Sequence, residues 1–407
     1  MDAPSILDSR AAWMRLALAL LISLIGNAGM WVIILTFPDV QAEFGASRSA
    51  ASLPYATTMI GFAVGNFVFG RVVDRLGLAS ALGASAVLMG LGFFATMLAP
   101  SIALLSGAQL VIGFGAAASF GPLFADVSRW FMKRRGIAVA IAASGNYLSG
   151  ALWPILLAGT LATDGWRAAN LILAVSCLVV MLPLTFLLRR KLPEAAIASA
   201  EVAAAIKAKT TGLSPRTLTL LLAFAGLCCC VAMSMPQVHI VSYCVDLGYG
   251  PAVGAEMLSL MLLGGVGSRL VSGMLADKLG GVKTLLIGSV AQCIALFLYL
   301  PTDGLVSLYL VSLIFGLSQG GIVPSYAVIV REYMPAREAG ARVGFVLMAT
   351  IMGMAIGGWL SGLIYDVTGS YQLAFINGIV WNGLNIGIMV WLLMRGRPRN
   401  AGQLRTV

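Results

Sequence analysis

The chain has little charge for its length. Only 10% of its 407 residues are Asp, Glu, Lys or Arg, whereas 59% are apolar. A soluble globule of this size needs more polar surface than that, so the composition excludes an ordinary soluble protein and favours one whose surface faces lipid. The net charge of +10 could indicate a nucleic-acid partner. Nearly all of the basic residues lie between apolar runs, where they set the orientation of membrane spans, so we expect no nucleic-acid partner.

The groups that enzymes use are also scarce. His239 is the only histidine, and the six cysteines lie in or beside apolar runs without metal-ligand spacing. Because a nucleophilic serine motif is missing as well, we expect no enzyme activity, no cofactor and no metal site. The first ten residues, MDAPSILDSR, lack the basic start and the cleavage pattern of a secretory signal, so we expect the first apolar run to be retained.

Long apolar runs dominate what is present. Twelve runs of about 20 residues recur along the chain, and a helix of that length crosses a bilayer core of about 30 Å. The one long polar interruption covers 189–216 and separates six runs in 1–188 from six in 217–407. The sequence therefore predicts an all-α polytopic membrane protein with two six-helix bundles joined by a linker.

The basic residues predict the orientation of these spans. Threading twelve spans through a membrane places nearly all Lys and Arg residues on one side, with Arg48 and Arg167 on the other side and Arg269 inside a span. By the positive-inside rule, the crowded side is cytoplasmic. We therefore expect a multi-pass protein of the inner (plasma) membrane that works as a monomer, with both termini and the linker in the cytoplasm.

A short motif occurs twice. GRVVDRLG, from Gly70 to Gly77, returns as GMLADKLG, from Gly273 to Gly280, and Gly61 matches Gly264 at the same offset. A repeat of this kind predicts two parallel, pseudo-symmetric halves related by an axis along the membrane normal. The motif and the twelve spans resemble the major facilitator superfamily, whose signature between helices two and three is G-x-x-x-D-R-x-G. The resemblance covers nearly the whole chain.

The resemblance implies a role for the motif in gating the cytoplasmic side. A carboxylate there can lie near the positive end of a helix in the other half and favour one closed arrangement. The alternative is a turn that only sets topology. The gating candidates are Gly70, Asp74, Arg75, Asp277 and Lys278.

A narrower resemblance, to the monocarboxylate porters and oxalate/formate antiporters, rests on three places. These are EFGASRS at 43–49, SRWFMKRRGIAVAIAASG at 128–145, and Arg269 in the eighth span, shortly before Asp277. In those families an arginine at this point binds the substrate carboxylate, which its planar donor fork matches. Burying an arginine in mid-span costs about 2.5–3.5 kcal/mol, so a partner is expected. Alternatively, the side chain reaches the cytoplasmic interface.

The repeat aligns Arg269 with Asn66, which predicts a guanidinium and an amide on opposing walls of a central site. Further candidates are polar side chains within apolar spans, and each of them could instead serve helix packing. These substrate-binding candidates are Tyr326, Tyr147, Asn27, Gln319 and Ser325.

The missing charges narrow the substrate. No lysine or arginine occurs from 343 to 394, where an oxalate carrier of this type would use a second cation. Arg269 is then the single cation of the central site, which favours a monocarboxylate over a dicarboxylate. An embedded carboxylate for a proton relay is also missing. Asp126 and Glu256 lie towards helix ends, and Gly265 stands where proton-coupled relatives can carry an acid. Proton symport through His239, the proton-coupling candidate, or through protonation of the substrate stays open.

Together these features predict a secondary active transporter that moves small monocarboxylates, such as lactate or pyruvate, across the lipid bilayer by alternating access. One alternative is a multidrug or hydrophobic-compound exporter of the same superfamily, although span five lacks the G-P-x-x-G-G pattern of such exporters. A non-transporting membrane sensor is the other alternative, and the absence of a soluble signalling domain argues against it.

Overall fold

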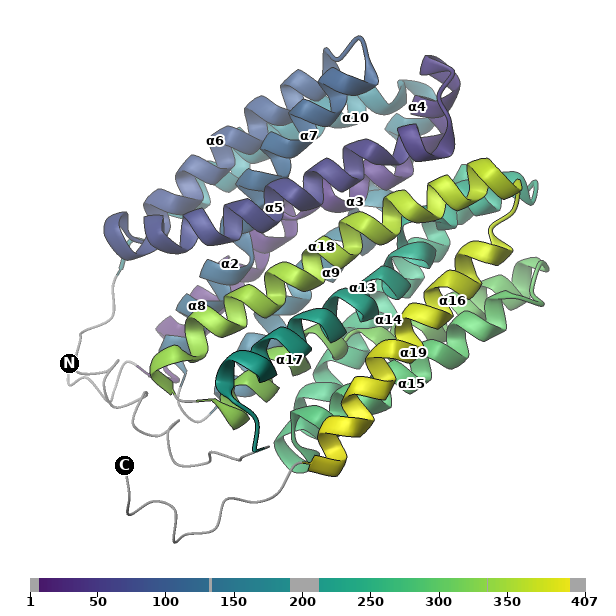
Figure 1. Cartoon of the computed structure of the whole chain (residues 1–407). Helices are drawn as coiled ribbons and strands as arrows, with labels where there is room; N and C mark the ends of the chain where they lie inside the picture. The colour runs from purple at the N-terminus through teal and green to yellow at the C-terminus, as the bar shows by residue number, and fades with distance from the viewer. Residues whose placement is uncertain (1–6, 132–133, 191–211, 335, 396–407) are drawn as a thin grey trace, which may run out of the picture.

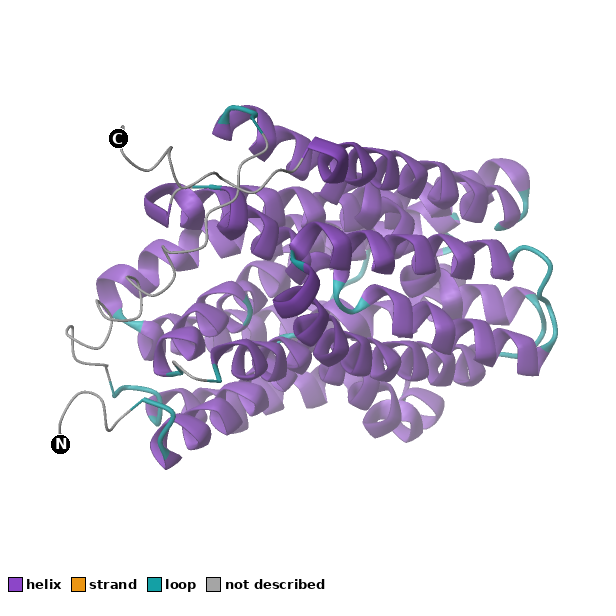
Figure 2. Ribbon diagram, turned by 90° about the horizontal axis from the view of Figure 1, so that it is seen from below, coloured by secondary structure: helices purple, strands orange, loops and turns teal. Residues whose placement is uncertain are grey.

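The computed structural model describes residues 7–131, 134–190, 212–334 and 336–395, without the side chains of 74, 135–136 and 336–341. The described residues form helices and no strand (Figure 2). Twelve helical segments among them are long and apolar enough to cross a membrane. In lipid, each span must satisfy its own backbone N–H and C=O groups, which is why long apolar runs fold as helices. The predicted fold class is confirmed.

The first six spans form one bundle, in which spans one, four and six are interrupted and the others are single helices. A short helix, α4 (Phe37–Phe44), joins spans one and two. The spans are, in order, α2 (Arg10–Gly26) with α3 (Ala28–Leu35), α5 (Arg48–Leu76), α6 (Leu78–Met97), α7 (Ile102–Ala116) with η1 (Ala117–Ser119) and α8 (Gly121–Trp130), α9 (Arg135–Thr163), and α10 (Gly165–Val175) with η2 (Ser176–Met181) and α11 (Leu182–Phe186).

The last six spans form a second bundle, with an interruption in span ten. They are α13 (Pro215–Asp246), α14 (Pro251–Leu279), α15 (Gly281–Tyr299), α16 (Leu305–Gln319) with α17 (Ile322–Tyr333), α18 (Ala336–Thr368) and α19 (Gln372–Arg395). Most of the predicted linker falls in 191–211, outside the described residues, so the proposed boundaries of 1–188, 189–216 and 217–407 stay predictions.

The two bundles share an interrupted fourth helix and a glycine turn. Span four is interrupted at η1, and span ten is interrupted between α16 and α17. Both copies of the motif end in a glycine of the same conformation, with Gly77 at φ 83° and ψ 163° and Gly280 at φ 83° and ψ 165°. A residue with a Cβ is strained in this region. The repeated glycines therefore mark a turn that the backbone requires in both halves.

The bundles lie side by side, with α5 next to α18 and α9 next to α14 across the interface (Figure 1). Small residues allow this approach. A Cβ on Gly358 of α18 would stand 3.0 Å from the Tyr55 ring of α5, and one on Gly362 would stand 3.0 Å from the backbone of Arg48. The start of α2 and the end of α19 lie at one end of the molecule, here named the termini end, and the opposite end is the far end.

At the far end, charged groups join the two bundles. Arg48, the first residue of α5, forms an ion pair with Asp246, the last residue of α13, and its guanidinium carbon lies 5.0 Å from the centroid of the Tyr365 ring. Asp366 accepts hydrogen bonds from the backbone N–H groups of Arg48 at 2.7 Å and Ser49 at 2.9 Å. The other ion pairs among the described residues, Arg15–Asp126 and Arg167–Glu43, lie within the first bundle.

Candidate functional site

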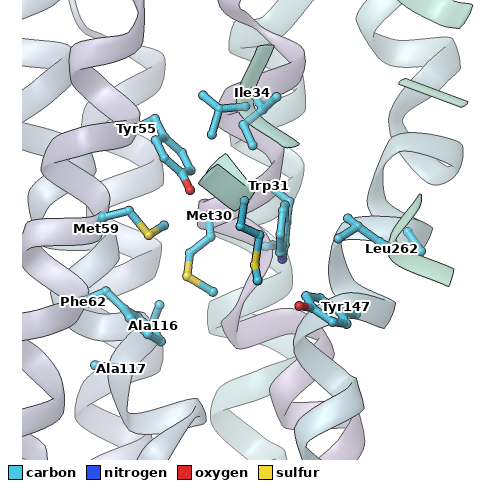
Figure 3. Close-up of a cluster of buried hydrophobic side chains, with 14 of the residues drawn as sticks. Met30, Trp31, Ile34, Tyr55, Met59, Phe62, Ala116, Ala117, Tyr147 and Leu262 are labelled. Atoms are coloured by element: carbon cyan, nitrogen blue, oxygen red, sulfur yellow. The ribbon is translucent and has the colours of Figure 1, made fainter. Parts of the chain in front are cut away.

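A cavity lies between the two bundles, with walls from both. It encloses about 650 Å³ of space between atoms, including the open solvent at its mouth. Figure 3 shows part of its wall in the first bundle. The lining comprises Met30 and Trp31 of α3; Tyr55, Met59 and Phe62 of α5; Phe120; Asn146 and Tyr147 of α9; Cys230, Met233 and Gln237 of α13; Arg269 of α14; Val323 of α17; and Leu347, Thr350, Ile351 and Met354 of α18.

Arg269 alone carries a charge among the described residues that line the cavity. Its side chain is buried, with 5% of the residue exposed. Nε donates a hydrogen bond to the carbonyl of Gly320 in its own bundle at 3.1 Å, and Nη1 donates to the carbonyl of Ala143 in the other bundle. The guanidinium therefore lies inside the protein and bridges the two halves.

The buried charge of Arg269 has no carboxylate partner among the described residues. Removing an ion from water costs several kcal/mol, which is why buried cations usually pair with an anion. A guanidinium carries five N–H donors, and the two backbone carbonyls accept from only two of them. The arrangement can therefore hold one small anion in the cavity.

Tyr147 and Trp31 form the wall beside this cation. The guanidinium carbon of Arg269 lies 4.1 Å from the centroid of the Tyr147 ring, a distance at which a cation attracts an aromatic face. Tyr147 meets Trp31 edge to face, with centroids 6.2 Å apart, and the indole N–H of Trp31 donates to Oδ1 of Asn146 at 2.7 Å. A Cβ on Gly265 would approach the Tyr147 ring to 2.9 Å, so this glycine makes room for the ring.

Of the predicted substrate-binding residues, Gln319 lies behind the cavity wall. It is fully buried, and its Oε1 accepts a hydrogen bond at 2.5 Å from Nε2 of Gln237, which does line the cavity. Nε2 of Gln319 has no hydrogen-bond partner among the described residues. Gln319 can therefore influence a ligand only through Gln237 in this arrangement.

The two asparagines of the prediction lie outside the cavity. Asn66 donates to the carbonyl of Phe62 in its own helix at 2.8 Å, and its Oδ1 points at Gly121. The structure does not bring Asn66 opposite Arg269, because the rotation of α5 about its axis directs Phe62, and not Asn66, towards the cavity. Asn27 is fully buried where α2 ends and donates to the carbonyl of Ser23 at 2.7 Å.

Tyr326 and Ser325 also lie outside the cavity, inside the second bundle. Tyr326 is fully buried and donates its hydroxyl hydrogen to Oδ1 of Asn385 at 2.7 Å. Ser325 donates to the carbonyl of Gly321 at 2.7 Å. Both hydroxyl donors are therefore used by the protein. Of the two predicted tyrosines, only Tyr147 lines the cavity.

His239 lies on α13 between the cavity residue Gln237 and Asp246 at the far end. Nε2 donates to the carbonyl of Gly358 at 2.7 Å, which leaves Nδ1 of a neutral ring to accept from the hydroxyl of Tyr371 at 3.0 Å. The histidine does not line the cavity, and both of its nitrogens have protein partners.

The predicted gating residues lie at the termini end. Gly70 is part of α5, and the side chains of Arg75, Asp277 and Lys278 are exposed at the ends of α5 and α14. None of these three forms an ion pair with another described residue. Asp74 belongs to α5, but its side chain lies outside the described residues.

Sequence reasoning missed the methionines of the lining, together with Tyr55 and Gln237. A weak signal exists in spacing, because Met233 and Gln237 stand four residues apart on α13, as do Thr350 and Met354 on α18. Residues at this spacing share a face of a helix. Many other apolar pairs in the same spans have the same spacing, so the signal does not select these residues.

Comparison with known proteins supports this architecture. The model described as Major Facilitator Superfamily matches residues 19–340 and 222–406. The chain is 27% identical to Monocarboxylate transporter 13 of Bos taurus, covering 86% of each sequence. It is 28% identical to Monocarboxylate transporter 11 of Homo sapiens, covering 91% of this chain and 80% of that one. It is also 24% identical to Agnestins efflux protein AgnL12 of Paecilomyces divaricatus, covering 77% and 71%.

A solved structure has a similar fold. It is that of a bacterial homolog to the human lysosomal transporter Spinster, in an inward-facing and occupied conformation. The TM-score is 0.68 over 93% of this chain and 94% of that one, at 15% identity. Two bundles of six spans around a central cavity define a membrane transporter. The chain belongs to the Major Facilitator Superfamily, a family of transporters and not of enzymes.

Proposed function

We propose that this protein is a secondary active transporter of small organic monocarboxylates. The observation that carries the proposal is Arg269, a buried cation at the cavity wall that donates to two backbone carbonyls and has no carboxylate partner among the described residues. A guanidinium matches a carboxylate in both charge and geometry. Similarity to relatives named monocarboxylate transporter 11 and 13 supports the same class of substrate.

The termini end faces the cytoplasm in this proposal, because the basic residues are concentrated there. Arg48, Asp246 and Asp366 hold the far end closed. The cavity of this conformation therefore exchanges substrate with the cytoplasm.

Transport follows from rocking of the two bundles about the cavity. Arg269 already contacts both bundles, through Gly320 and Ala143. A bound carboxylate neutralises the guanidinium at their interface, which favours closure of the termini end around the substrate and release of the far end. In the conformation that opens the far end, the gating set of Gly70, Asp74, Arg75, Asp277 and Lys278 closes the termini end.

Any coupled proton travels on the carboxyl group of the substrate. Among the described residues, the lining contains no carboxylate and no histidine. The two acidic candidates for a proton relay have partners elsewhere. Asp126 pairs with Arg15, and Glu256 accepts a hydrogen bond from the hydroxyl of Tyr309. His239, the other candidate carrier, stands behind the cavity and is held by Gly358 and Tyr371.

A second candidate is an exporter of hydrophobic compounds, which the methionine and aromatic lining favours. The similarity to a protein named as an agnestins efflux protein is in keeping with that candidate. An exporter of neutral or cationic compounds has no need of a buried, unpaired arginine, so the two candidates differ in their dependence on Arg269. A non-transporting sensor would bind ligands but show no counterflow.

The test is uptake of labelled pyruvate and phenylpyruvate into proteoliposomes containing Arg269→Gln or Arg269→Lys. Arg269→Gln removes the two charged hydrogen bonds that the guanidinium would donate to the substrate carboxylate. Because each contributes about 1.5–3 kcal/mol, we expect at least a 100-fold decrease in transport efficiency. Arg269→Lys keeps the charge but loses the planar fork, so it should be intermediate or inactive.

Arg167→Gln is the matched control for this experiment. It removes a half-buried arginine whose ion-pair partner, Glu43, belongs to the same bundle, and it should transport normally. Wild-type uptake by a folded Arg269→Gln protein would exclude the proposed site. Binding of the acids without counterflow by the wild-type protein would favour a sensor.

A further inference from the structure

The walls around Arg269 are unusually rich in sulfur and aromatic rings. Four methionines and five aromatic residues line the cavity, together with Cys230. Methionine sulfur makes favourable contacts with aromatic rings, and its flexible side chain adapts to different shapes. Such a wall stabilises an apolar body and gives little to a short, hydrated acid, which would leave most of this surface against water.

Thr350, Asn146 and Gln237 of the lining each have a hydrogen bond to another part of the protein. Thr350 donates to the carbonyl of Leu347 at 2.7 Å. The Oδ1 atom of Asn146 accepts from Trp31, and Nε2 of Gln237 donates to Gln319. These three groups are therefore less available to a polyhydroxylated ligand, and the two tyrosine hydroxyl groups are the main neutral donors left for a ligand. A second carboxylate would meet no second cation among the described lining residues.

Two tyrosines border an apolar gap. In Figure 3 the hydroxyl groups of Tyr55 and Tyr147 both point into the space between them, beside Met30 and Met59. Tyr147 stands next to Arg269 and marks the end at which a carboxylate binds. The space towards Tyr55 is bordered by the methionine side chains, so a ligand extending from Arg269 passes between sulfur atoms and rings.

From this arrangement we infer that the preferred substrate is a monocarboxylate with an aromatic body, whose carboxylate lies on Arg269 and whose ring packs against Met30, Met59 and Phe62. The inference rests on the proposed function and narrows it. The carboxylate supplies the anion that the buried guanidinium lacks, and the ring fills the apolar part of the cavity. Short acids such as lactate or pyruvate supply the anion but do not fill the apolar part of the cavity.

The experiment compares acids that differ in one feature, using the purified full-length protein in proteoliposomes. Phenylpyruvate and pyruvate share the keto acid group and differ by a phenyl ring. Phenethylamine keeps the ring without the carboxylate, and benzylmalonate adds a second carboxylate. We expect half-saturation for phenylpyruvate at a concentration at least tenfold lower than for pyruvate, with no transport of phenethylamine or benzylmalonate.

The outcomes separate this inference from the function on which it rests. If pyruvate is transported as well as phenylpyruvate or better, the inferred preference for an aromatic body is wrong, whereas the proposed transport of monocarboxylates is still supported. Transport of benzylmalonate at the same efficiency as phenylpyruvate would also overturn the single-carboxylate specificity. If neither keto acid is transported and phenethylamine is, both proposals fail.

A pair of methionine variants tests where the ring binds. Met59→Ala removes a sulfur from the lining, whereas Met348→Ala removes one from the exposed surface of α18. We expect Met59→Ala to lower the preference for phenylpyruvate over pyruvate at least threefold and Met348→Ala to leave it unchanged. An unchanged preference in Met59→Ala would exclude packing of the ring against this wall.

Discussion

The ties at the far end allow a direct test of how the two bundles move. Asp366 of α18 accepts hydrogen bonds from the backbone N–H groups of Arg48 at 2.7 Å and Ser49 at 2.9 Å, the first two residues of α5. These N–H groups have no acceptor within their own helix. A carboxylate of one bundle therefore caps a helix of the other. Asp366→Asn removes the charge and one of the two acceptor oxygens.

The size of the effect follows from these contacts. Hydrogen bonds to a charged group contribute about 1.5–3 kcal/mol, and an anion at a helix N-terminus contributes about 0.3–1 kcal/mol. Asp366 is exposed, and solvent weakens such interactions, so we take a loss of about 1.4 kcal/mol, which is about tenfold in an equilibrium constant. The contacts exist only while the far end is closed. The ratio of open to closed far ends should therefore rise about tenfold.

Pulsed electron paramagnetic resonance can measure this ratio. Spin labels at Ala42 and Ala252 report the separation of the two bundles, because both residues are exposed and lie at the far end on opposite sides of the interface. The six native cysteines are replaced by alanine for this purpose. In Asp366→Asn, the long-distance component should grow about tenfold relative to the short one.

Glu43→Gln is the matched control. Hydrogen bonding from Arg167 holds the pKa of the Glu43 carboxyl below its ordinary value, so Glu43 is charged at neutral pH. Its ion pair lies at the far end but within one bundle, so its loss should leave the distances unchanged. The reasoning is refuted by wild-type distances in Asp366→Asn, and equally by the same change in Glu43→Gln.

Three further substitutions test the cavity and the repeat. Gly265→Val would displace the Tyr147 ring, because a Cβ alone at this position approaches the ring to 2.9 Å, and acid uptake should fall at least tenfold. The control is Gly267→Val, which has open space around it and should transport normally. Tyr147→Phe keeps the ring beside Arg269 and loses one donor, so titration of uptake should show half-saturation raised about fivefold, as expected for about 1 kcal/mol. Gly280→Ala puts a Cβ at φ 83°, which costs about 1–3 kcal/mol and should lower the thermal unfolding midpoint; an unchanged midpoint would contradict the backbone argument.

Local signals were sufficient to predict the fold. Each span follows from a run of apolar residues, and the two bundles follow from the repeat that ends in Gly77 and Gly280. The structure adds the reason for that repeat, since both glycines have the same positive φ. Hydrophobicity and backbone conformation are properties of neighbouring residues, so they can be recognised in one sequence. Arg269 was recognisable in the same way, as a charge inside an apolar span.

Only the tertiary structure decided which residues surround Arg269. Tyr147 and Tyr326 look alike in sequence, but one lies against the guanidinium and the other bonds to Asn385 inside its bundle. The repeat placed Asn66 opposite Arg269, whereas the rotation of α5 presents Phe62 to the cavity. Every face of a membrane helix can be apolar, so periodicity does not show which face looks inward. Packing against the neighbouring helices sets that rotation, and with it the methionine and aromatic wall beside the arginine.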